Sequence, residues 1–384
     1  MQQIAEQRDA EWQSNRGDAA DERERRAAAK GKKTRAKPAT KRSKPALANA
    51  DLAAELKELP AAASRFIPPM KPKLLDDPPA GDWVYELKFD GFRIVAVKNG
   101  EKVNLVSRNG NELAAKFPEV AEAVRALPVN DCVIDGEVVA LDEQGRSSFQ
   151  LLQALELEGR KSPTYYYVFD LLQAEGRSLT AQPLEFRKEM LQRVCGDVGE
   201  PIRYSGDVGS DAEPLLAQVK QLGLEGLIGK QRGSVYEPDR RSGLWIKLKV
   251  LNEQEFVIGG YTPPGGSRKH FGALLVGYYD GKKLLFAGKV GTGFNAKSLA
   301  ALHKRFKAEE QPDCPFADLP SKQGGQWVQG ITPAMMKRCT WVNPVFVCQL
   351  KFAEWTRDAK LRQPVFLGMR EDKAASDVKR EQPA

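Results

Sequence analysis

Alternating apolar and polar residues dominate the middle of the chain and predict short strands interrupted by a few helices. A period of two places strands at residues 83–88, 94–97, 103–106, 132–141, 165–171, 226–230 and 245–250. Asn99-Gly100 lies between two of them and is typical of a two-residue hairpin turn. Apolar residues at helical spacing predict helices at residues 117–127 and 213–222, the second ending at Gly223. This mixture of antiparallel hairpins and helices indicates an α+β domain.

The pattern after residue 252 is almost entirely one of strands. They are predicted at residues 256–261, 274–279, 284–290 and 341–352, and Asp280-Gly281 closes one hairpin. A single helix is predicted at residues 297–306. Short strands with one helix are typical of a small barrel such as an OB fold. The sequence therefore predicts a β-rich domain after the α+β domain.

The first 65 residues are polar and poor in aromatic residues, with one short helix predicted at 51–59. Residues 30–44 (KGKKTRAKPATKRSK) contain eight Lys or Arg and no acidic residue. Such a block cannot bury enough apolar surface to fold, so we predict a disordered arm. We expect a basic extension at 1–65, the two domains at 66–250 and 251–374, and a flexible tail at 375–384.

Composition narrows the classes of function. The chain has a net charge of +8 and a pI near 9.1, which favours nucleic acid as the partner of the basic arm, with a linker or solubility tail as the alternative. Five widely spaced cysteines and two histidines support neither a zinc site nor a disulfide framework. Because there is no signal sequence and no apolar run of about 18 residues, we expect a soluble, cytoplasmic protein. We also expect it to be monomeric and associated with the nucleoid. Its chemistry would rest on Lys, Arg, Asp, Glu and a hard metal ion.

Residues 88–93 (KFDGFR) carry the strongest candidate chemistry, because they combine a lysine, a carboxylate, a turn glycine and an arginine. Strand alternation places Glu86 and Lys88 on one face, and Arg93 returns beside the lysine. A lysine has a pKa of about 10.4 and becomes a nucleophile only when cationic neighbours or burial remove its proton. The alternative is a polar hairpin edge with solvated charges.

Two acidic segments could serve a metal ion. Glu137 lies in the apolar strand VIDGEVVAL, where a carboxylate is either exposed at a sheet edge or a ligand for a hard cation. Glu225 and Lys230 flank small residues at which a backbone approaches something closely, although two surface charges would give the same pattern.

The strand WIKLK, residues 245–249, sends Lys247 and Lys249 to one face. Two parallel lysines repel each other unless an anion lies between them, and a polyphosphate would fit. Phe169, on an apolar strand, could stack on a base or could simply belong to the core.

Read in order, six segments resemble motifs I, Ia, III, IIIa, IV and V of the covalent nucleotidyltransferases, which comprise DNA ligases, RNA ligases and mRNA capping enzymes. They are residues 88–93, 107–110, 135–137, 169–170, 225–230 and 245–249. Segments 261–268, 271–277, 352–356 and 361–373 resemble the ligase module of bacterial DNA ligase D, an ATP-dependent end-joining enzyme. Residues 370–373 (REDK) would be motif VI. Gln349 departs from the glutamate that members of this family often carry there.

The resemblance implies an ATP-grasp-like nucleotidyltransferase (adenylation) domain followed by an OB-fold domain. It implies that Lys88 attacks the α-phosphate of ATP, that lysyl-AMP passes its AMP to a 5′-phosphate, and that a 3′-hydroxyl then expels AMP. Glu137 and Glu225 would hold Mg²⁺ or Mn²⁺. The implied nucleotide contacts are Glu86 on adenine, Phe169 on the purine face, Arg93 and Arg108 on ribose and phosphates, Lys230, Lys247 and Lys249 on phosphates, and Arg370 and Lys373 on pyrophosphate.

The same resemblance implies nicked or broken double-stranded DNA as substrate, DNA repair and recombination by bacterial non-homologous end joining, and bacterial Ku and an end-joining polymerase as partners. The alternatives are an RNA ligase or GTP-using capping enzyme of the same fold, and a non-catalytic DNA-binding adaptor. The linker-like ends of the chain fit either a stand-alone ligase or a piece of a larger architecture.

Overall fold

A computed structural model describes residues 46–158, 162–196, 198–266, 268–319, 331 and 333–382. The predicted basic arm at 30–44 lies outside these residues. The last part of the predicted extension contains helix α2 (Ala46–Leu56), whose Leu52 and Leu56 are buried in the main core. The predicted extension at 1–65 therefore ends too late. Leucines four residues apart give this helix an apolar face, which packs into the first domain. Among the described residues, no helix is both long and apolar enough to span a bilayer.

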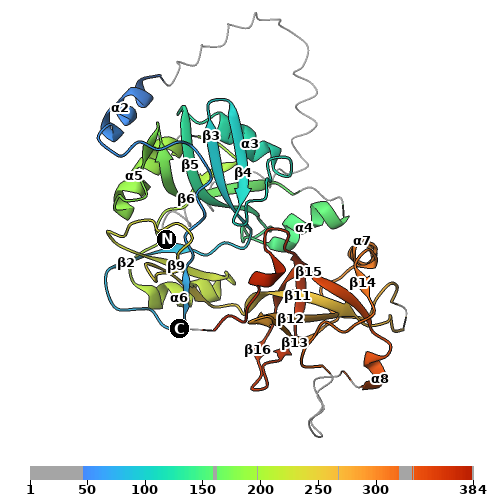
Figure 1. Cartoon of the computed structure of the whole chain (residues 1–384). Helices are drawn as coiled ribbons and strands as arrows, with labels where there is room; N and C mark the ends of the chain where they lie inside the picture. Colours follow the sequence, from blue (N-terminus) through green and yellow to red (C-terminus); the bar gives the residue numbers. More distant parts are fainter. Residues whose placement is uncertain are drawn as a thin grey trace, which may run out of the picture. The chain divides into compact units, whose positions relative to one another are not determined.

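The first large sheet has the strand order β4-β3-β5-β6-β7, with neighbours antiparallel, and β8 adds to β6 in parallel. Its strands are β3 (Phe92–Asn99), β4 (Lys102–Ser107), β5 (Asp131–Ala140), β6 (Thr164–Ala174), β7 (Arg177–Ser178) and β8 (Ile202–Tyr204). Helices α3 (Pro118–Arg125), α4 (Phe149–Glu158) and α5 (Leu184–Cys195) pack with it (Figure 1). The predicted hairpin is confirmed, with its two-residue turn at Gly100-Glu101, one position later than expected, because Asn99 pairs with Lys102.

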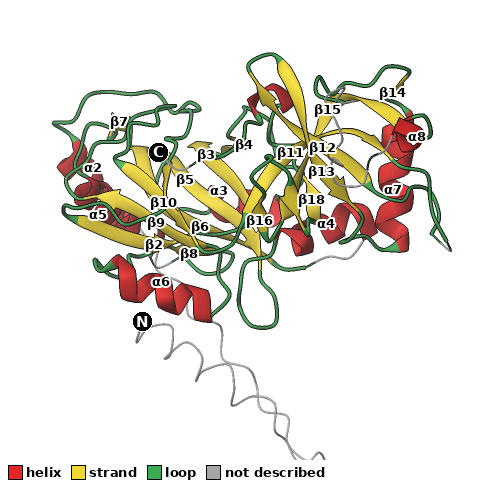
Figure 2. Ribbon diagram, turned by 90° about the horizontal axis from the view of Figure 1, so that it is seen from below, coloured by secondary structure: helices red, strands yellow, loops and turns green. Residues whose placement is uncertain are grey.

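A second sheet has the order β1-β10-β9-β2 and lies against the first. Its strands are β1 (Lys73–Leu75), β2 (Trp83–Leu87), β9 (Gly226–Gln231) and β10 (Trp245–Lys249). Helix α6 (Ala212–Gln221) covers its outer face, as Figure 2 shows, and buries Leu215 and Val219 there. On the inner face Trp245 packs with Val95 and Val133 of the first sheet. These elements, from α2 to β10, form what we call the two-sheet region, and its α+β class is confirmed.

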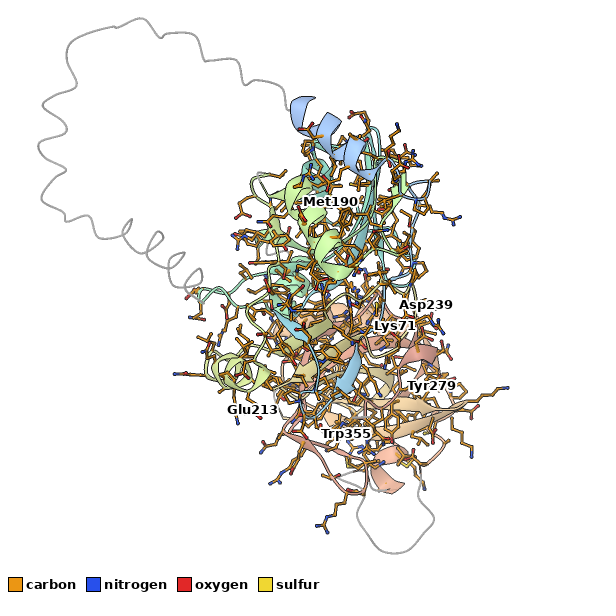
Figure 3. The ribbon with its side chains drawn as sticks, turned by 90° about the vertical axis from the view of Figure 1, so that its left-hand side faces the viewer. Lys71, Met190, Glu213, Asp239, Tyr279 and Trp355 are labelled. Carbon is orange, nitrogen blue, oxygen red and sulfur yellow. The ribbon has the colours of Figure 1, made fainter. Side chains whose placement is uncertain are left out.

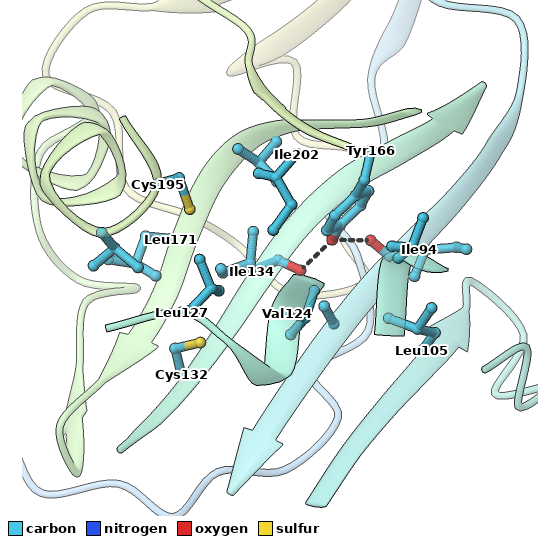
Figure 4. Close-up of a cluster of buried hydrophobic side chains, with 14 of the residues drawn as sticks. Ile94, Leu105, Val124, Leu127, Cys132, Ile134, Tyr166, Leu171, Cys195 and Ile202 are labelled. Carbon is cyan, nitrogen blue, oxygen red and sulfur yellow. Dashed lines mark hydrogen bonds between the residues drawn. The ribbon is translucent and has the colours of Figure 1, made fainter. Parts of the chain in front are cut away.

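Two glycines are required where the first sheet is most tightly packed. The Tyr166 hydroxyl lies 3.0 Å from the carbonyl oxygens of Ile94 and Ile134, to which it donates (Figure 4). A Cβ on Gly136 would lie 2.5 Å from the Tyr166 ring, and one on Gly91 would lie 2.2 Å from a backbone oxygen. Both motif positions therefore require glycine, because the neighbouring atoms leave no room for a side chain.

We expect Gly136→Ala to lower the free energy of unfolding by about 1–3 kcal/mol, because the added methyl forces the Tyr166 ring or the strand to move. The midpoint of urea denaturation measures this loss. Gly199→Ala is the matched control, since a Cβ there meets no atom within 4 Å. An unchanged midpoint for Gly136→Ala would contradict the packing described.

The remaining elements, from β11 to η1, form what we call the β-rich region. Its sheet has the order β13-β12-β11-β15-β14, with β18 on β15, and a separate hairpin pairs β16 with β17. The strands are β11 (Glu253–Tyr261), β12 (Leu274–Asp280), β13 (Lys283–Val290), β14 (Glu310–Gln311), β15 (Thr340–Lys351), β16 (Glu354–Trp355), β17 (Leu361–Arg362) and β18 (Val365–Met369). The helices are α7 (Ala296–Lys307), α8 (Pro333–Met336) and the 3₁₀ turn η1 (Ala375–Asp377). The four long strands and the helix predicted here are confirmed.

The last described residues are packed against the protein, which corrects the prediction of a flexible tail at 375–384. Val378 is completely buried in the core of the β-rich region, and its carbonyl accepts a 2.7 Å hydrogen bond from the Tyr279 amide. The polar composition of the tail predicts flexibility, but it contains one valine, Val378, that anchors it in the core. The sequence reveals neither that contact nor the ion pairs of Glu381 described below.

Candidate active site

One cavity of about 230 Å³ gathers the residues singled out by the sequence motifs. It is lined by side chains from β2, β3, β5, β6, β9, β10 and β11. All twelve predicted nucleotide and metal residues line it: Glu86, Lys88, Arg93, Arg108, Glu137, Phe169, Glu225, Lys230, Lys247, Lys249, Arg370 and Lys373. Gln349 and Lys71 line it as well, and Lys71, labelled in Figure 3, pairs with Asp239. Motifs spread over almost three hundred residues thus converge on a single site.

Sheet pairing places Lys88 beside Glu225. Leu87 of β2 lies opposite Leu227 of β9, so the next residue, Lys88, donates its amide to Gly226 at 3.0 Å. Its Nζ lies 2.5 Å from Glu225 Oε1, and the side chain is 19% exposed. Burial lowers the pKa of Lys88, but Glu225, Glu137 and Asp90 outweigh burial and raise it above the ordinary value. In this arrangement Lys88 is an ammonium ion, contrary to the expectation that its surroundings alone would remove the proton.

Two carboxylates beside Lys88 fit a hard cation. Burial raises the pKa of Glu137 to about 7, against the opposing effect of Lys88, Arg370 and Arg93. Glu225 is 6% exposed, and its second oxygen, Oε2, is buried without a hydrogen-bond partner in the described structure. The described residues contain no cluster of three or more His, Cys, Asp or Glu able to hold a metal alone. Two carboxylates nevertheless suit Mg²⁺, which usually takes one or two from the protein and completes its shell with phosphate oxygens and water.

Glu86 is held by two lysines. Its Oε1 lies 2.5 Å from Lys188 Nζ and 2.9 Å from Lys230 Nζ, and the residue is 2% exposed. Lys188 comes from α5 and also donates to the Ser205 carbonyl at 2.8 Å. Burial lowers the pKa of Lys230 to about 8 despite the nearby Glu86. Strand alternation identifies Glu86 and a motif contains Lys230, but Lys188 lies in neither pattern and was missed.

Arg93 is fixed by a residue of the same motif as Glu137. Its guanidinium makes two hydrogen bonds to Asp135, at 3.0 and 2.6 Å, and Asp135 is completely buried. The guanidinium also lies over the rings of Phe169 and Trp245, at 5.3 and 5.4 Å from their centres. This arrangement holds Arg93 and Phe169 together at one wall of the cavity, where a planar base and its sugar could be bound.

The residue after Phe169 forms the most buried ion pair described. Asp170 and Arg187 are both 0% exposed and are joined by two hydrogen bonds, at 2.8 and 2.9 Å. Arg187 Nη1 also donates to the carbonyls of Gln182 and Ser234. The pair therefore ties α5 to the middle of β6, next to Phe169.

Lys247 and Lys249 lie on one face of β10, as strand alternation predicts, and an anion lies between them. That anion is Glu381, whose two carboxylate oxygens lie 2.7 Å from Lys247 Nζ and 2.8 Å from Lys249 Nζ. Burial alone would raise the pKa of Glu381, but the two lysines outweigh it and lower the pKa to about 2. The anion that we expected between these two lysines is therefore present, and it is a carboxylate of the protein itself.

The β-rich region contributes a second charged group. Glu255 of β11 pairs with both Arg108 and Lys373, which together lower its pKa well below the usual range although burial opposes them. Arg370 is held by Asp372 through two hydrogen bonds of 2.8 Å and donates to the Gly91 carbonyl at 3.1 Å. Motif VI thus contacts the loop that carries Lys88. Glu255 belongs to no sequence motif and was missed, since it lies in a strand whose nine residues are all buried.

Comparisons with known proteins agree with this geometry. The family model described as "ATP dependent DNA ligase domain" matches residues 60–249, and "ATP dependent DNA ligase C terminal region" matches residues 267–373. The multifunctional non-homologous end joining protein LigD of Pseudomonas aeruginosa is 41% identical over 323 residues, covering 83% of this chain and 37% of that protein. The Mycobacterium tuberculosis LigD is 34% identical over 306 residues, with coverages of 79% and 38%.

A solved structure matches nearly throughout its own length. A mycobacterial DNA ligase D complexed with ATP and MES has a TM-score of 0.57 and 30% identity to this chain, and the match covers 81% of this chain and 98% of that one. By contrast, the chain spans less than two fifths of the length of the two LigD proteins. The likeness is therefore to their ligase part.

Proposed function

This chain belongs to the family of ATP-dependent DNA ligases, and from that premise we propose that it joins 5′-phosphate and 3′-hydroxyl ends of DNA through a lysyl-AMP intermediate on Lys88. The observation that carries the proposal is the convergence of all twelve predicted site residues on one cavity, which Lys88 lines. The fold agrees, with a nucleotidyltransferase domain followed by an OB fold. We assign the first domain to the two-sheet region and the second to the β-rich region, with the boundary near residue 250 and motif VI on the second.

In the first step the Lys88 amine attacks the α-phosphorus of ATP. An N–P bond forms as the P–O bond to the leaving pyrophosphate breaks. Glu225 Oε1, 2.5 Å from Nζ, is positioned to accept the proton that Lys88 must lose first. The carboxylates that hold Lys88 as an ammonium also keep it in place until the nucleotide arrives.

A divalent cation, with Mg²⁺ and Mn²⁺ as the candidates, would be held by Glu137 and Glu225 and would supply positive charge to the phosphates. We assign the purine face to Phe169 and the ribose and phosphates to Arg93 and Arg108. Lys188 and Lys230 both contact Oε1 of Glu86, so we assign its Oε2 to the adenine amino group.

Arg370 and Lys373 lie at the cavity in the present arrangement and are suited to orienting the departing pyrophosphate. Nicked DNA must later reach the same site, so the second domain must move away after adenylation. We propose double-stranded DNA with nicks or breaks as the substrate and end joining as the setting. We further propose bacterial Ku and an end-joining polymerase as partners, as the resemblance described in the sequence analysis implies.

The test is covalent labelling of the 42.5 kDa chain by α-labelled ATP and a divalent cation, compared with α-labelled GTP. We expect labelling by ATP alone, followed by transfer to a nicked DNA duplex and sealing. Labelling by GTP would indicate a capping-type enzyme, and sealing of RNA ends alone would indicate an RNA ligase. A chain that binds DNA but takes no label would be an adaptor. Family membership favours none of these alternatives.

A further inference from the structure

The residues from the start of η1 onward form a strap, which we define as residues 375–381. Three backbone groups fix it to the β-rich region: the Val378 carbonyl accepts from the Tyr279 amide at 2.7 Å, the Lys379 carbonyl accepts from Gln254 Nε2 at 3.0 Å, and the Glu381 amide donates to Gln254 Oε1 at 3.1 Å. Arg380 lies over the Trp355 ring, 4.7 Å from its centre. These contacts fix the backbone of the strap so that the Glu381 side chain lies at the cavity.

Glu381 connects the two regions, because its backbone is bound to the β-rich region and its carboxylate contacts the two-sheet region. Its carboxylate is bound by Lys247 and Lys249, one oxygen to each, and the side chain is 27% exposed. The two lysine side chains are only 12% and 14% exposed, so each depends on this one anion for much of its charge compensation. Glu381 also lines the cavity, whose 230 Å³ fall below the roughly 300–1,000 Å³ of ordinary small-molecule sites.

We propose that the strap is an autoinhibitory element whose Glu381 carboxylate occupies the phosphate cradle formed by Lys247 and Lys249 until a nucleotide displaces it. The inference rests on the proposed function in assigning these lysines to the phosphates of ATP. Each oxygen of Glu381 takes one of the two lysine donors, so carboxylate and phosphate compete for the same donors. The apparent affinity for nucleotide is then reduced by the fraction of molecules in which the strap is bound.

The strap also joins the two regions, because it is anchored on β11 and β12 and binds β10. Displacement of Glu381 by phosphates therefore removes one contact that holds the β-rich region over the site. Nucleotide binding and loosening of this contact are coupled by the same pair of lysines.

The experiment compares the full chain with Glu381→Gln, which keeps the size of the side chain and removes its charge. Glu354→Gln is the matched control, since Glu354 forms an exposed pair with Arg362 outside the cavity. The probe is adenosine 5′-(α,β-methylene)triphosphate, which cannot transfer AMP, and its binding is measured by calorimetry. Adenosine, which lacks phosphates, is the second probe, and thermal unfolding without ligand checks that each variant folds.

We expect Glu381→Gln to bind the triphosphate analogue roughly 3- to 30-fold more tightly than the parent chain, with adenosine binding unchanged and Glu354→Gln like the parent. Equal or weaker analogue binding by Glu381→Gln would overturn the proposal, and so would an equal gain for adenosine, which would indicate steric blocking. Labelling of the parent chain by α-labelled ATP is measured separately. Its absence would refute the proposed function, whereas an unchanged analogue affinity in a chain that takes the label would refute the strap alone.

Discussion

Lys88→Ala is expected to lower the rate of labelling by ATP by a factor of roughly 10⁴ or more, because it removes the amine that forms the N–P bond in the proposed first step. Sealing of a nick that already carries AMP on its 5′-phosphate should remain measurable, since that step does not use the amine. Intact-mass spectrometry detects the adenylyl group, and gel assays on the two kinds of nick separate the steps.

Lys88→Arg provides a control for charge. It keeps a cation beside Glu225, so it preserves the ion pair that the alanine variant removes. Arginine stays protonated in proteins and cannot serve as the nucleophile. Both variants should fail to take label, while Lys282→Ala, in an exposed turn, should behave like the parent. Label on Lys88→Ala would mean that another residue is the nucleophile.

Asp170→Ala is expected to cost about 3–5 kcal/mol of stability, because it leaves Arg187 charged, buried and without its carboxylate. This is a large part of the roughly 5–15 kcal/mol that stabilises a typical domain. The free energy of unfolding from urea denaturation measures it. Phe169 precedes Asp170 on β6, so analogue binding should weaken in molecules that remain folded.

The double variant Asp170→Ala/Arg187→Met shows how much of the loss in Asp170→Ala comes from leaving Arg187 without a partner. Removing both charges eliminates the uncompensated cation, so the double variant should be more stable than Asp170→Ala alone. Arg193→Ala is the control on the same helix, because its pair with Glu55 is about one third exposed. That variant should lose less than about 1 kcal/mol. If Asp170→Ala lost no more than Arg193→Ala, the buried pair would not stabilise the fold as described.

The residues of the site could be predicted because each motif is local. Strand alternation puts Glu86 and Lys88 on one face and both Lys247 and Lys249 on another, and these directions hold in the structure. The partners of these cations could not be predicted in the same way. Glu381 meets its lysines across more than 130 residues, and Lys188 meets Glu86 across 102. Such distant pairings depend on tertiary packing, which no local pattern reports.

Helix α5 was missed for a related reason. Its buried face includes Arg187 and Lys188 among the apolar residues, so the apolar spacing that marks an amphipathic helix is interrupted there. Those two charged residues serve Asp170 and Glu86. The two charged side chains that connect this helix to the site therefore also interrupt the apolar pattern by which the helix would be predicted.

The paired charges of the cavity make it an ion exchanger. Carboxylates already accompany its cations: Glu225 with Lys88, Asp135 with Arg93, Glu255 with Arg108 and Lys373, Asp372 with Arg370, and Glu381 with Lys247 and Lys249. A polyphosphate that enters replaces some of these counter-ions instead of meeting bare positive charge. Net attraction then contributes little, and selection falls to how well each oxygen fits its donors. Added salt should consequently weaken nucleotide binding at this site much less than it weakens the binding of DNA to an open basic surface.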